Sequence, residues 1–193
     1  MNWQLRAINK TKRYSYLVRL VPWVKSIVII NSVASGKCGP SSDIDLMLIV
    51  STRRLYISKF MVRIILKALG QLESKHSSVQ KFSLGTFIDT TGIDWRKHGM
   101  LVNQDKFYKW IDSYIFIYGD GYDYLMNLDH VHKNIRHKIR IPIFSLGLDY
   151  IDKYAQHVHY KHTLSQHKNW QNHSFIRLEP KNISLHAFDD SIF

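Results

Sequence analysis

The segment VKSIVIINSVASGKCGPSSDIDLMLIV, residues 24–50, decides the fold because it places two hydrophobic strands on either side of a loop of small residues. The stretch at 24–30 is rich in β-branched residues, which is typical of a buried strand. The stretch at 43–50 predicts a second strand after the Gly- and Pro-containing loop. Two acids, Asp43 and Asp45, interrupt this second strand and require a physical explanation.

The two acids are expected to lie together. Side chains alternate between the faces of a strand, so Asp43 and Asp45 would share one face with Cα atoms roughly 6.6 Å apart. Carboxylates at this spacing repel each other, and burial of either one without a partner is costly. Mg²⁺ resolves both problems because it binds carboxylate oxygens together with water and substrate phosphate. An isolated Asp-x-Asp also occurs at solvent-facing positions, so the interpretation depends on the neighbouring segments.

The loop before the two acids has the composition of a phosphate-binding turn. Ser32 is predicted to cap a short helix over 33–35, whose free N–H groups would face an anion. Gly36 and Gly39 allow the backbone to approach phosphate closely, and Lys37 is the nearest basic side chain. Together with the paired acids, this loop predicts a site for a metal-bound phosphate.

The remaining periodicities predict a mixed α/β (α+β) fold, with a mixed sheet flanked by helices. Residues 1–100 are expected to form the core, and residues 101–193 a helical region with a terminal β-hairpin packed on it. Apart from the two strands above, helices are predicted at 4–22, 53–73, 105–119, 121–135 and 143–162, and strands at 79–89 and on either side of a turn at 180–182.

The composition is that of a globular protein, with 193 residues of which 45% are hydrophobic and 22% charged. No apolar run approaches the ~20 residues that a membrane span needs, and the first 20 residues lack the apolar region of a signal peptide. The single cysteine, Cys38, excludes an internal disulfide framework. We therefore expect no membrane span and a cytoplasmic location.

The net charge of +12 is concentrated in the first half of the chain. Residues 1–103 contain 16 Lys and Arg against 5 Asp and Glu. A basic surface of this size attracts polyanions such as nucleic acid, nucleoside triphosphates or an acidic membrane face. The alternative is a solvated basic surface without a dedicated partner.

Three segments together resemble a known family. They are the Ser-Asp-Ile-Asp-Leu sequence at 42–46, RRLYISK at 53–59 and KFSLGTFID at 81–89. This pattern resembles the signature of the nucleotidyltransferase superfamily that includes DNA polymerase beta, and in particular its small bacterial and archaeal nucleotidyltransferase-domain proteins. The resemblance covers residues 20–90 and is looser beyond them.

The resemblance implies a set of catalytic and metal-binding residues. Asp43 and Asp45 are implied as metal ligands, and a third carboxylate on a neighbouring strand would complete the site. Asp89 matches that third position best, with Asp94 as the alternative. The third acid could also help to deprotonate the acceptor hydroxyl.

The resemblance also implies a nucleotide-binding set, in which the Ser32 loop holds the β- and γ-phosphates. The family usually has Gly before this Ser, whereas this chain has Asn31. Asn readily replaces Gly at positive φ, so the turn can be kept. The basic side chains near 53–59 equally fit a solvated helix face. The nucleotide-binding candidates are Asn31, Ser32, Gly36, Lys37, Ser42, Arg54 and Lys59.

By this resemblance the chain is expected to be a nucleotidyltransferase that uses Mg²⁺ or Mn²⁺ to move a nucleoside monophosphate from an NTP to an acceptor hydroxyl, with release of pyrophosphate. The acceptor is left open between RNA, including tRNA, and a partner protein. Two alternatives stay open: an inactive nucleotide- or RNA-binding module on the same fold, and a toxin–antitoxin component that nucleotidylates a protein or a tRNA.

Two other clusters have competing interpretations. Histidines gather at 157–173, and His159 with His162 could share a helix face, but no Cys or carboxylate completes a recognisable metal-ligand set. Aromatic residues at 108–124 could stack on bases, although their spacing favours a helical core.

Overall fold

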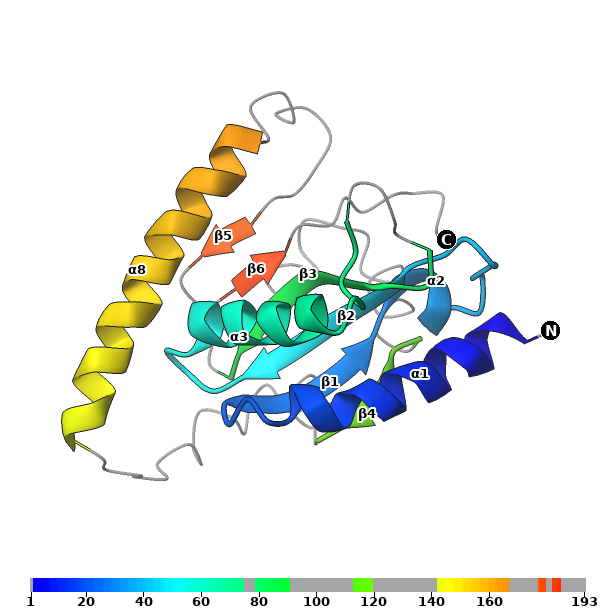
Figure 1. Cartoon of the computed structure of the whole chain (residues 1–193), viewed down its shortest axis with the longest axis horizontal. Helices are drawn as coiled ribbons and strands as arrows, with labels where there is room; N and C mark the ends of the chain where they lie inside the picture. The colour runs from blue at the N-terminus through cyan, green and yellow to red at the C-terminus, as the bar shows by residue number, and fades with distance from the viewer. Residues whose placement is uncertain are drawn as a thin grey trace.

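The computed structural model describes residues 2–74, 79–90, 113–119, 142–166, 177–179 and 182–184. The helices and strands in these residues follow the order shown in Figure 1. They are α1 (Trp3–Val18), β1 (Val24–Ile29), α2 (Asn31–Ala34), β2 (Ile44–Val50), α3 (Leu55–Ala68), β3 (Phe82–Asp89), β4 (Ile115–Tyr118), α8 (Pro142–Gln166), β5 (Arg177–Glu179) and β6 (Asn182–Ser184).

Within the described residues, six strands form one mixed sheet in the order β4-β1-β2-β3-β6-β5. β1 and β2 are antiparallel and enclose the loop that contains α2. β2 and β3 are parallel, which requires the crossover through α3. β4 pairs antiparallel with β1, and β6 pairs antiparallel with β3. The mixed α/β class expected from the sequence is confirmed.

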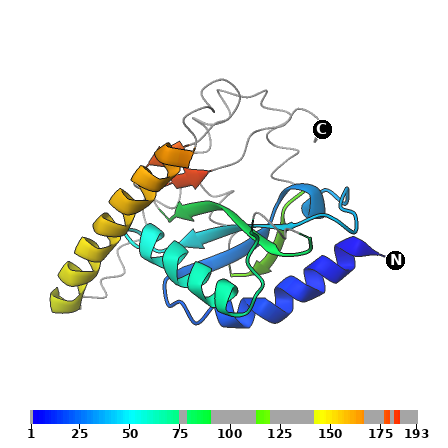
Figure 2. The ribbon, with the colours of Figure 1, turned by 45° about the horizontal axis from the view of Figure 1, so that its top comes forward.

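The hydrophobic core lies between one face of the sheet and helices α1 and α3, which cover that face in Figures 1 and 2. Alternate residues of β2, from Ile44 to Val50, belong to this core. The intervening residues Asp45, Met47 and Ile49 are also buried, on the opposite face. Burial on both faces explains why β2 is hydrophobic almost throughout.

An irregularity in the pairing of β2 with β3 changes the phase of β3. Asp45 pairs with Ser83, whereas Met47 pairs with Thr86, so β3 contains one extra residue between these two pairs. Before the irregularity, Ser83 shares a face with Asp45 because the two are strand partners. Beyond the irregularity, Asp89 pairs with Val50 and lies on the face that α3 covers.

Most of the predicted elements are confirmed. The helix predicted at 4–22 is α1 and ends earlier, with Arg19 as its C-cap. The helix predicted at 53–73 is α3, and Gly70 at φ +65° follows its end. The helix at 143–162 is α8, and the terminal hairpin is present as β5 and β6.

The helix predicted at 105–119 is wrong where the structure describes it. Residues 115–118 form strand β4, which pairs with β1 at the edge of the sheet. The local sequence IFIY suits a strand, and the Ser26 hydroxyl adds a hydrogen bond of 2.8 Å to the Tyr118 carbonyl. The rest of that prediction, and the helix predicted at 121–135, lie outside the described residues.

The predicted division near residue 100 does not separate the sheet. β4 and the β5–β6 hairpin come from the second part of the chain, yet they extend the sheet on both sides of β1, β2 and β3.

None of the described helices is both long enough and apolar enough to cross a bilayer.

Candidate functional site at the Asn31 turn

The chain reverses direction after β1 through Asn31, whose φ of +59° is rare for a residue with a side chain. Asn is tolerated there because its short polar side chain can form a local hydrogen bond. Its amide nitrogen donates to a carboxylate oxygen of Asp45 at 3.1 Å. The Asp45 carbonyl also accepts a bond from the Ile30 amide at 3.1 Å. These bonds fix the turn directly against the start of β2.

Helix α2 begins at Asn31, which is earlier than predicted. Ile30 is its N-cap and supplies no side-chain hydrogen bond. The prediction that Ser32 caps this helix is therefore wrong, because Ser32 lies within its first turn. Its carbonyl accepts a bond from the Ser35 hydroxyl at 3.3 Å.

Asp45 is a strongly perturbed acid at this end of the sheet. It is 8% exposed, and burial raises its pKa to about 6. Hydrogen bonds from Asn31 and Ser83 lower the pKa in part, whereas the nearby charge of Glu73 raises it further. Its carboxylate is thus costly to ionise in the free protein, which is a physical signature common at functional sites.

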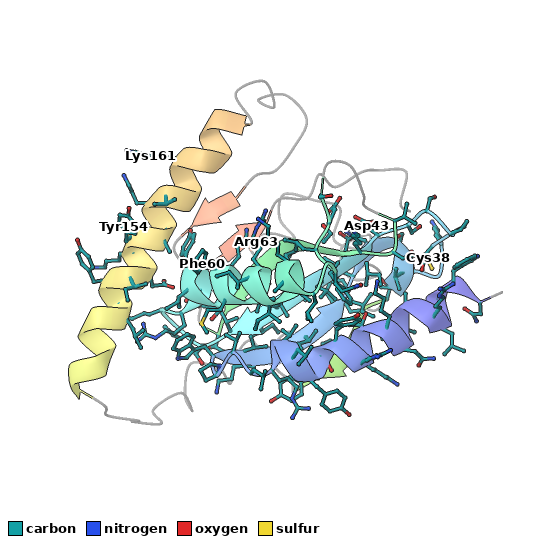
Figure 3. The ribbon with its side chains drawn as sticks, viewed as in Figure 1. Cys38, Asp43, Phe60, Arg63, Tyr154 and Lys161 are labelled. Atoms are coloured by element: carbon teal, nitrogen blue, oxygen red, sulfur yellow. The ribbon has the colours of Figure 1, made fainter. Side chains whose placement is uncertain are left out.

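Asp43 has a different environment from Asp45. It precedes β2, is partly buried and lines a small pocket next to α1. Strand alternation applies only from Ile44 onward, so it does not place the Asp43 side chain. Figure 3 labels Asp43 near α2 and the start of α1, at the far side of the molecule from α8. The paired acids therefore lie at one end of the sheet, with Asp45 under the Asn31 turn.

Asp89 does not join this pair. In the parallel pairing it lies beside Val50, five positions along β2 from Asp45, a separation of roughly 16 Å. It also lies on the α3 face, whereas Asp45 lies on the other. The structure thus separates the predicted third acid from the first two. Asp94, its alternative, lies outside the described residues.

Three of the predicted nucleotide-binding residues beyond Asn31 and Ser32 lie in the loop between α2 and β2. Gly36 has a φ of +76°, so its position in the loop depends on glycine. The Ser42 hydroxyl accepts a bond from the Gly39 amide at 2.9 Å and closes the loop. Lys37 is exposed between the two glycines. This part of the predicted set stays close in sequence and space to the Asn31 turn.

Arg54 and Lys59 lie at the opposite end of the sheet, after the end of β2. Arg54 forms an ion pair with Asp149 of α8. Lys59 is 3% exposed, with its ammonium 5.5 Å from the centre of the Phe87 ring. Burial and the charge of Arg63 lower the pKa of Lys59 to about 7. Both side chains follow the far end of β2 from Asp45, so the structure separates them from the rest of the predicted set.

The structure adds two residues that the sequence patterns did not indicate. Glu73 follows α3, and its amide donates to the Phe82 carbonyl at 2.9 Å, which brings it to the start of β3. Ser83 is the strand partner of Asp45. Glu73 carried no motif signal because its position depends on the turn after Gly70. Ser83 could have been found only by knowing the register of β2 with β3.

The donor set at this end is suited to a hard cation. Carboxylates are the ligands that Mg²⁺ prefers, and Mg²⁺ commonly takes only one or two of them, with water and substrate phosphate as the rest. A bound cation would also reverse the unfavourable ionisation of Asp45. Among the described residues, no cluster of three or more His, Cys, Asp or Glu has the arrangement of a complete metal site. The candidate ligands are thus limited to the two carboxylates of Asp43 and Asp45, with water and substrate for the other positions.

The other clusters contribute little to this site. His157 is exposed on α8, and the side chains of the other histidines at 159–173 lie outside the described residues. Of the aromatic residues at 108–124, those that the structure describes lie in or next to strand β4 and not in a helix.

Comparisons with known proteins found no match: no family model, no curated protein and no solved structure is similar to this chain.

Proposed function

We propose that this protein is a nucleotidyltransferase that uses Mg²⁺ to transfer a nucleoside monophosphate from an NTP to an acceptor hydroxyl. The observation that carries the proposal is the buried Asp45 carboxylate, with a pKa raised to about 6, held beneath a turn at positive φ. This supports the resemblance at residues 42–46 because Asn31 adopts the backbone conformation that a glycine would have.

The transfer has a simple balance. The acceptor oxygen bonds to the α-phosphorus, the bond between that phosphorus and pyrophosphate breaks, and the acceptor proton passes to solvent. Asp43 and Asp45 would hold Mg²⁺, which when bound would neutralise charge on the triphosphate. Asn31 orients the Asp45 carboxylate through its 3.1 Å hydrogen bond. The loop with Ser32 and Lys37 would hold the leaving pyrophosphate.

The test is NTP turnover with and without Mg²⁺, measured as pyrophosphate release. Asp45→Asn keeps the size of the side chain and removes its charge, so we expect turnover to fall by about 100-fold or more. The matched control is Asp149→Asn on α8, which removes the same charge at the other end of the molecule. Turnover should stay within about threefold of the parent in that control. Equal turnover in Asp45→Asn and the parent would refute the proposal.

The pH dependence gives a second measurement on the same protein. Because the pKa of Asp45 is about 6 in the metal-free protein, protons compete with Mg²⁺ below that pH. The Mg²⁺ concentration for half-maximal turnover should rise as the pH falls from 7 to 5. In Asn31→Ala, which removes the amide donor, the same rise should begin at a higher pH. An unchanged Mg²⁺ requirement across this range would contradict the assigned role of Asp45.

A further inference from the structure

Helix α1 is strongly basic. Its 16 residues include Arg6, Lys10, Lys12 and Arg13 and no acidic residue. Arg6, Lys12 and Arg13 are exposed, whereas Lys10 is partly buried. Basic charge so concentrated, without acids to balance it, gives this helix a local positive potential that attracts a polyanion.

The basic and aromatic residues of α1 share one side of the helix. Arg6 and Arg13 are seven positions apart, which places them on the same face at a spacing of about 10 Å. Tyr16 is 68% exposed on that side, and the Arg6 guanidinium lies 5.6 Å from the centre of the Trp3 ring. The buried residues of α1, Ala7, Thr11, Ser15 and Val18, lie on the opposite side of the helix. Cations with interleaved aromatic rings are the recurring surface for nucleic-acid strands with unpaired bases.

A pocket connects the basic face to the candidate site. Trp3, Arg6 and Lys10 line one wall, and Ser42 and Asp43 lie on the other. The cavity volume of this pocket is about 20 Å³, and its empty space is about 290 Å³ when open solvent is included. This cavity volume is far below the roughly 300 to 1,000 Å³ of sites that surround a small molecule. The pocket therefore suits a backbone group of a longer ligand lying across it, not a nucleotide buried within it.

Three cations lie close together beside this pocket. Burial lowers the pKa of Lys10, and the nearby charges of Arg6 and Lys81 lower it further, which shows that three cations are close together. The Lys10 ammonium donates to the Gln80 carbonyl, so it is anchored at the pocket wall. A phosphate here would relieve the repulsion between these cations.

The α1 helix is also hydrogen-bonded to the Asn31 turn. The Gln4 amide donates to the carbonyls of Val33 at 2.9 Å and Ala34 at 3.3 Å, at the end of α2. A ligand bound along α1 would therefore have one end next to Asp43 and the loop that contains Lys37.

We propose that the exposed side of α1, with the pocket beside Asp43, binds a single-stranded polynucleotide whose terminal hydroxyl is the acceptor. This inference rests on the proposed function, and it names the acceptor class. Arg6 and Arg13 contact the phosphate backbone, and Trp3 and Tyr16 stack on unpaired bases. The ligand chemistry is a polyphosphate strand with free bases, which RNA and single-stranded DNA share.

The experiment measures strand binding without NTP or Mg²⁺, by fluorescence anisotropy of labelled 12-nucleotide oligo(U) and oligo(dT) at several salt concentrations. The test variant is Arg6→Gln with Arg13→Gln, and the matched control is Lys153→Gln with Lys161→Gln, two exposed residues of α8. The test variant should bind about 10-fold more weakly at 0.1 M salt, and the slope of log K against log[salt] should be flatter by about 1.4. The control should change affinity by less than about twofold. Tighter binding of oligo(U) would identify RNA as the strand.

A second variant separates stacking from charge. Tyr16→Ala should weaken binding several-fold while the salt slope stays unchanged, because stacking releases no counterions. Circular dichroism checks that each variant is folded. Equal losses of affinity in the α1 and α8 charge variants would overturn the proposal, because they would show that the strand is attracted only by the overall positive charge.

Two further outcomes distinguish this inference from the proposed function. Binding to anionic phosphatidylglycerol vesicles but not to oligonucleotides would overturn the strand site, and exposed Leu5, Leu17 and Leu20 of this region would then account for the membrane contact. Turnover onto a small acceptor without strand binding would keep the transferase and remove this inference. Strand binding that depends on Arg6 and Arg13, in a protein without NTP turnover, would keep the surface and reject the transferase.

Discussion

A carboxylate is buried near each end of the sheet, and the two carboxylates have different surroundings. Asp45 at the β2 start and Asp152 on α8 are both 8% exposed, and burial raises the pKa of each. Asp152 accepts a hydrogen bond from the backbone amide of Ile57 at 2.8 Å and lies near the cation of Arg54, and both favour its ionised form. Each acid also has a like charge nearby that raises its pKa: Glu73 for Asp45, and Asp149 for Asp152. The net rise at Asp45 is large, to about 6, although Asn31 and Ser83 donate hydrogen bonds to it.

The groups that each carboxylate bonds distinguish a structural buried acid from a functional one. Asp152 replaces the missing cap of α3, whose N-cap Arg54 provides no side-chain hydrogen bond. Its burial therefore satisfies a backbone group and joins two helices. Asp45 accepts a side-chain bond from Asn31 at the turn, and its surroundings still raise its pKa to about 6. A carboxylate whose surroundings disfavour its charge is a better candidate ligand for a cation than for a place in the core.

The largest expected effect concerns Lys59, a buried charge at the α8 end. Its ammonium has no hydrogen-bond partner among the described residues. Lys59→Met should raise the free energy of unfolding by about 3 to 5 kcal/mol at pH 6. The size of this gain follows from the lowering of the Lys59 pKa from 10.5 to about 7 on folding. Below pH 7 this lysine is charged in both folded and unfolded protein, so the folded state has the full cost of burial. That cost fades as the pH rises from 7 towards 10.5.

Urea unfolding of Lys59→Met and the parent at pH 6 and pH 10 measures this difference. The exposed Lys67→Met on the same helix is the control and should show little change with pH. A gain that is larger at pH 10 than at pH 6 would contradict the lowered pKa. It would also mean that the buried Lys59 ammonium is not an uncompensated charge at the α8 end.

Asp45→Asn is expected to have the next largest effect on stability. The pKa of Asp45 is raised from 3.8 to about 6, so its ionisation destabilises the folded state at neutral pH. Removal of the charge should raise the free energy of unfolding by about 2 to 3 kcal/mol at pH 8. The gain should shrink as the pH falls through 6 and vanish below about 4, where the acid is protonated in both states.

Thermal unfolding at pH 8 and pH 4.5, without divalent ions, tests the sign of this effect. Addition of Mg²⁺ should stabilise the parent and leave Asp45→Asn unchanged, since ligand binding to the folded state adds to its stability. Loss of stability in Asp45→Asn at pH 8 would mean that Asp45 is a structural acid like Asp152, so that the two ends of the sheet would not differ.

The smallest effect is expected at Asp152. Asp152→Ala removes the acceptor for the Ile57 amide and should lower the free energy of unfolding by about 1 kcal/mol. Asp152→Asn keeps an acceptor oxygen and should lose less than half of that. Urea unfolding at pH 7 compares the two variants. A larger loss in Asp152→Asn than in Asp152→Ala would show that the charge, and not the cap, is what α3 requires.

Much of the fold could be predicted because local patterns and burial agree. β1 and β2 are hydrophobic runs rich in β-branched residues, α3 has a helical period, and Gly70 follows its end with the positive φ that glycine allows. The error at 115–118 arose because a short aromatic run fits a helix or a strand, and pairing with β1 decided between them.

The candidate site was predictable only in part. Asn31 and Asp45 are 14 positions apart, and the antiparallel pairing of β1 with β2 brings them together. The positive φ expected for Asn31 is confirmed. Asp89 could not be judged from sequence because its position depends on the direction and register of β3. The parallel pairing and the extra residue near Ser83 place it at the other end and on the other face.

The mixed class, the strand–turn–strand around Asn31 and the basic first half follow from the sequence alone, because these depend on composition and on residues close along the chain. Only the tertiary structure decided which distant residues meet. Parallel pairing brought Ser83 to Asp45, the turn after α3 brought Glu73 close, and α8 brought Asp152 to the start of α3. The physical reason is that strand register and helix packing are fixed by burial over the whole sheet, which no short motif encodes.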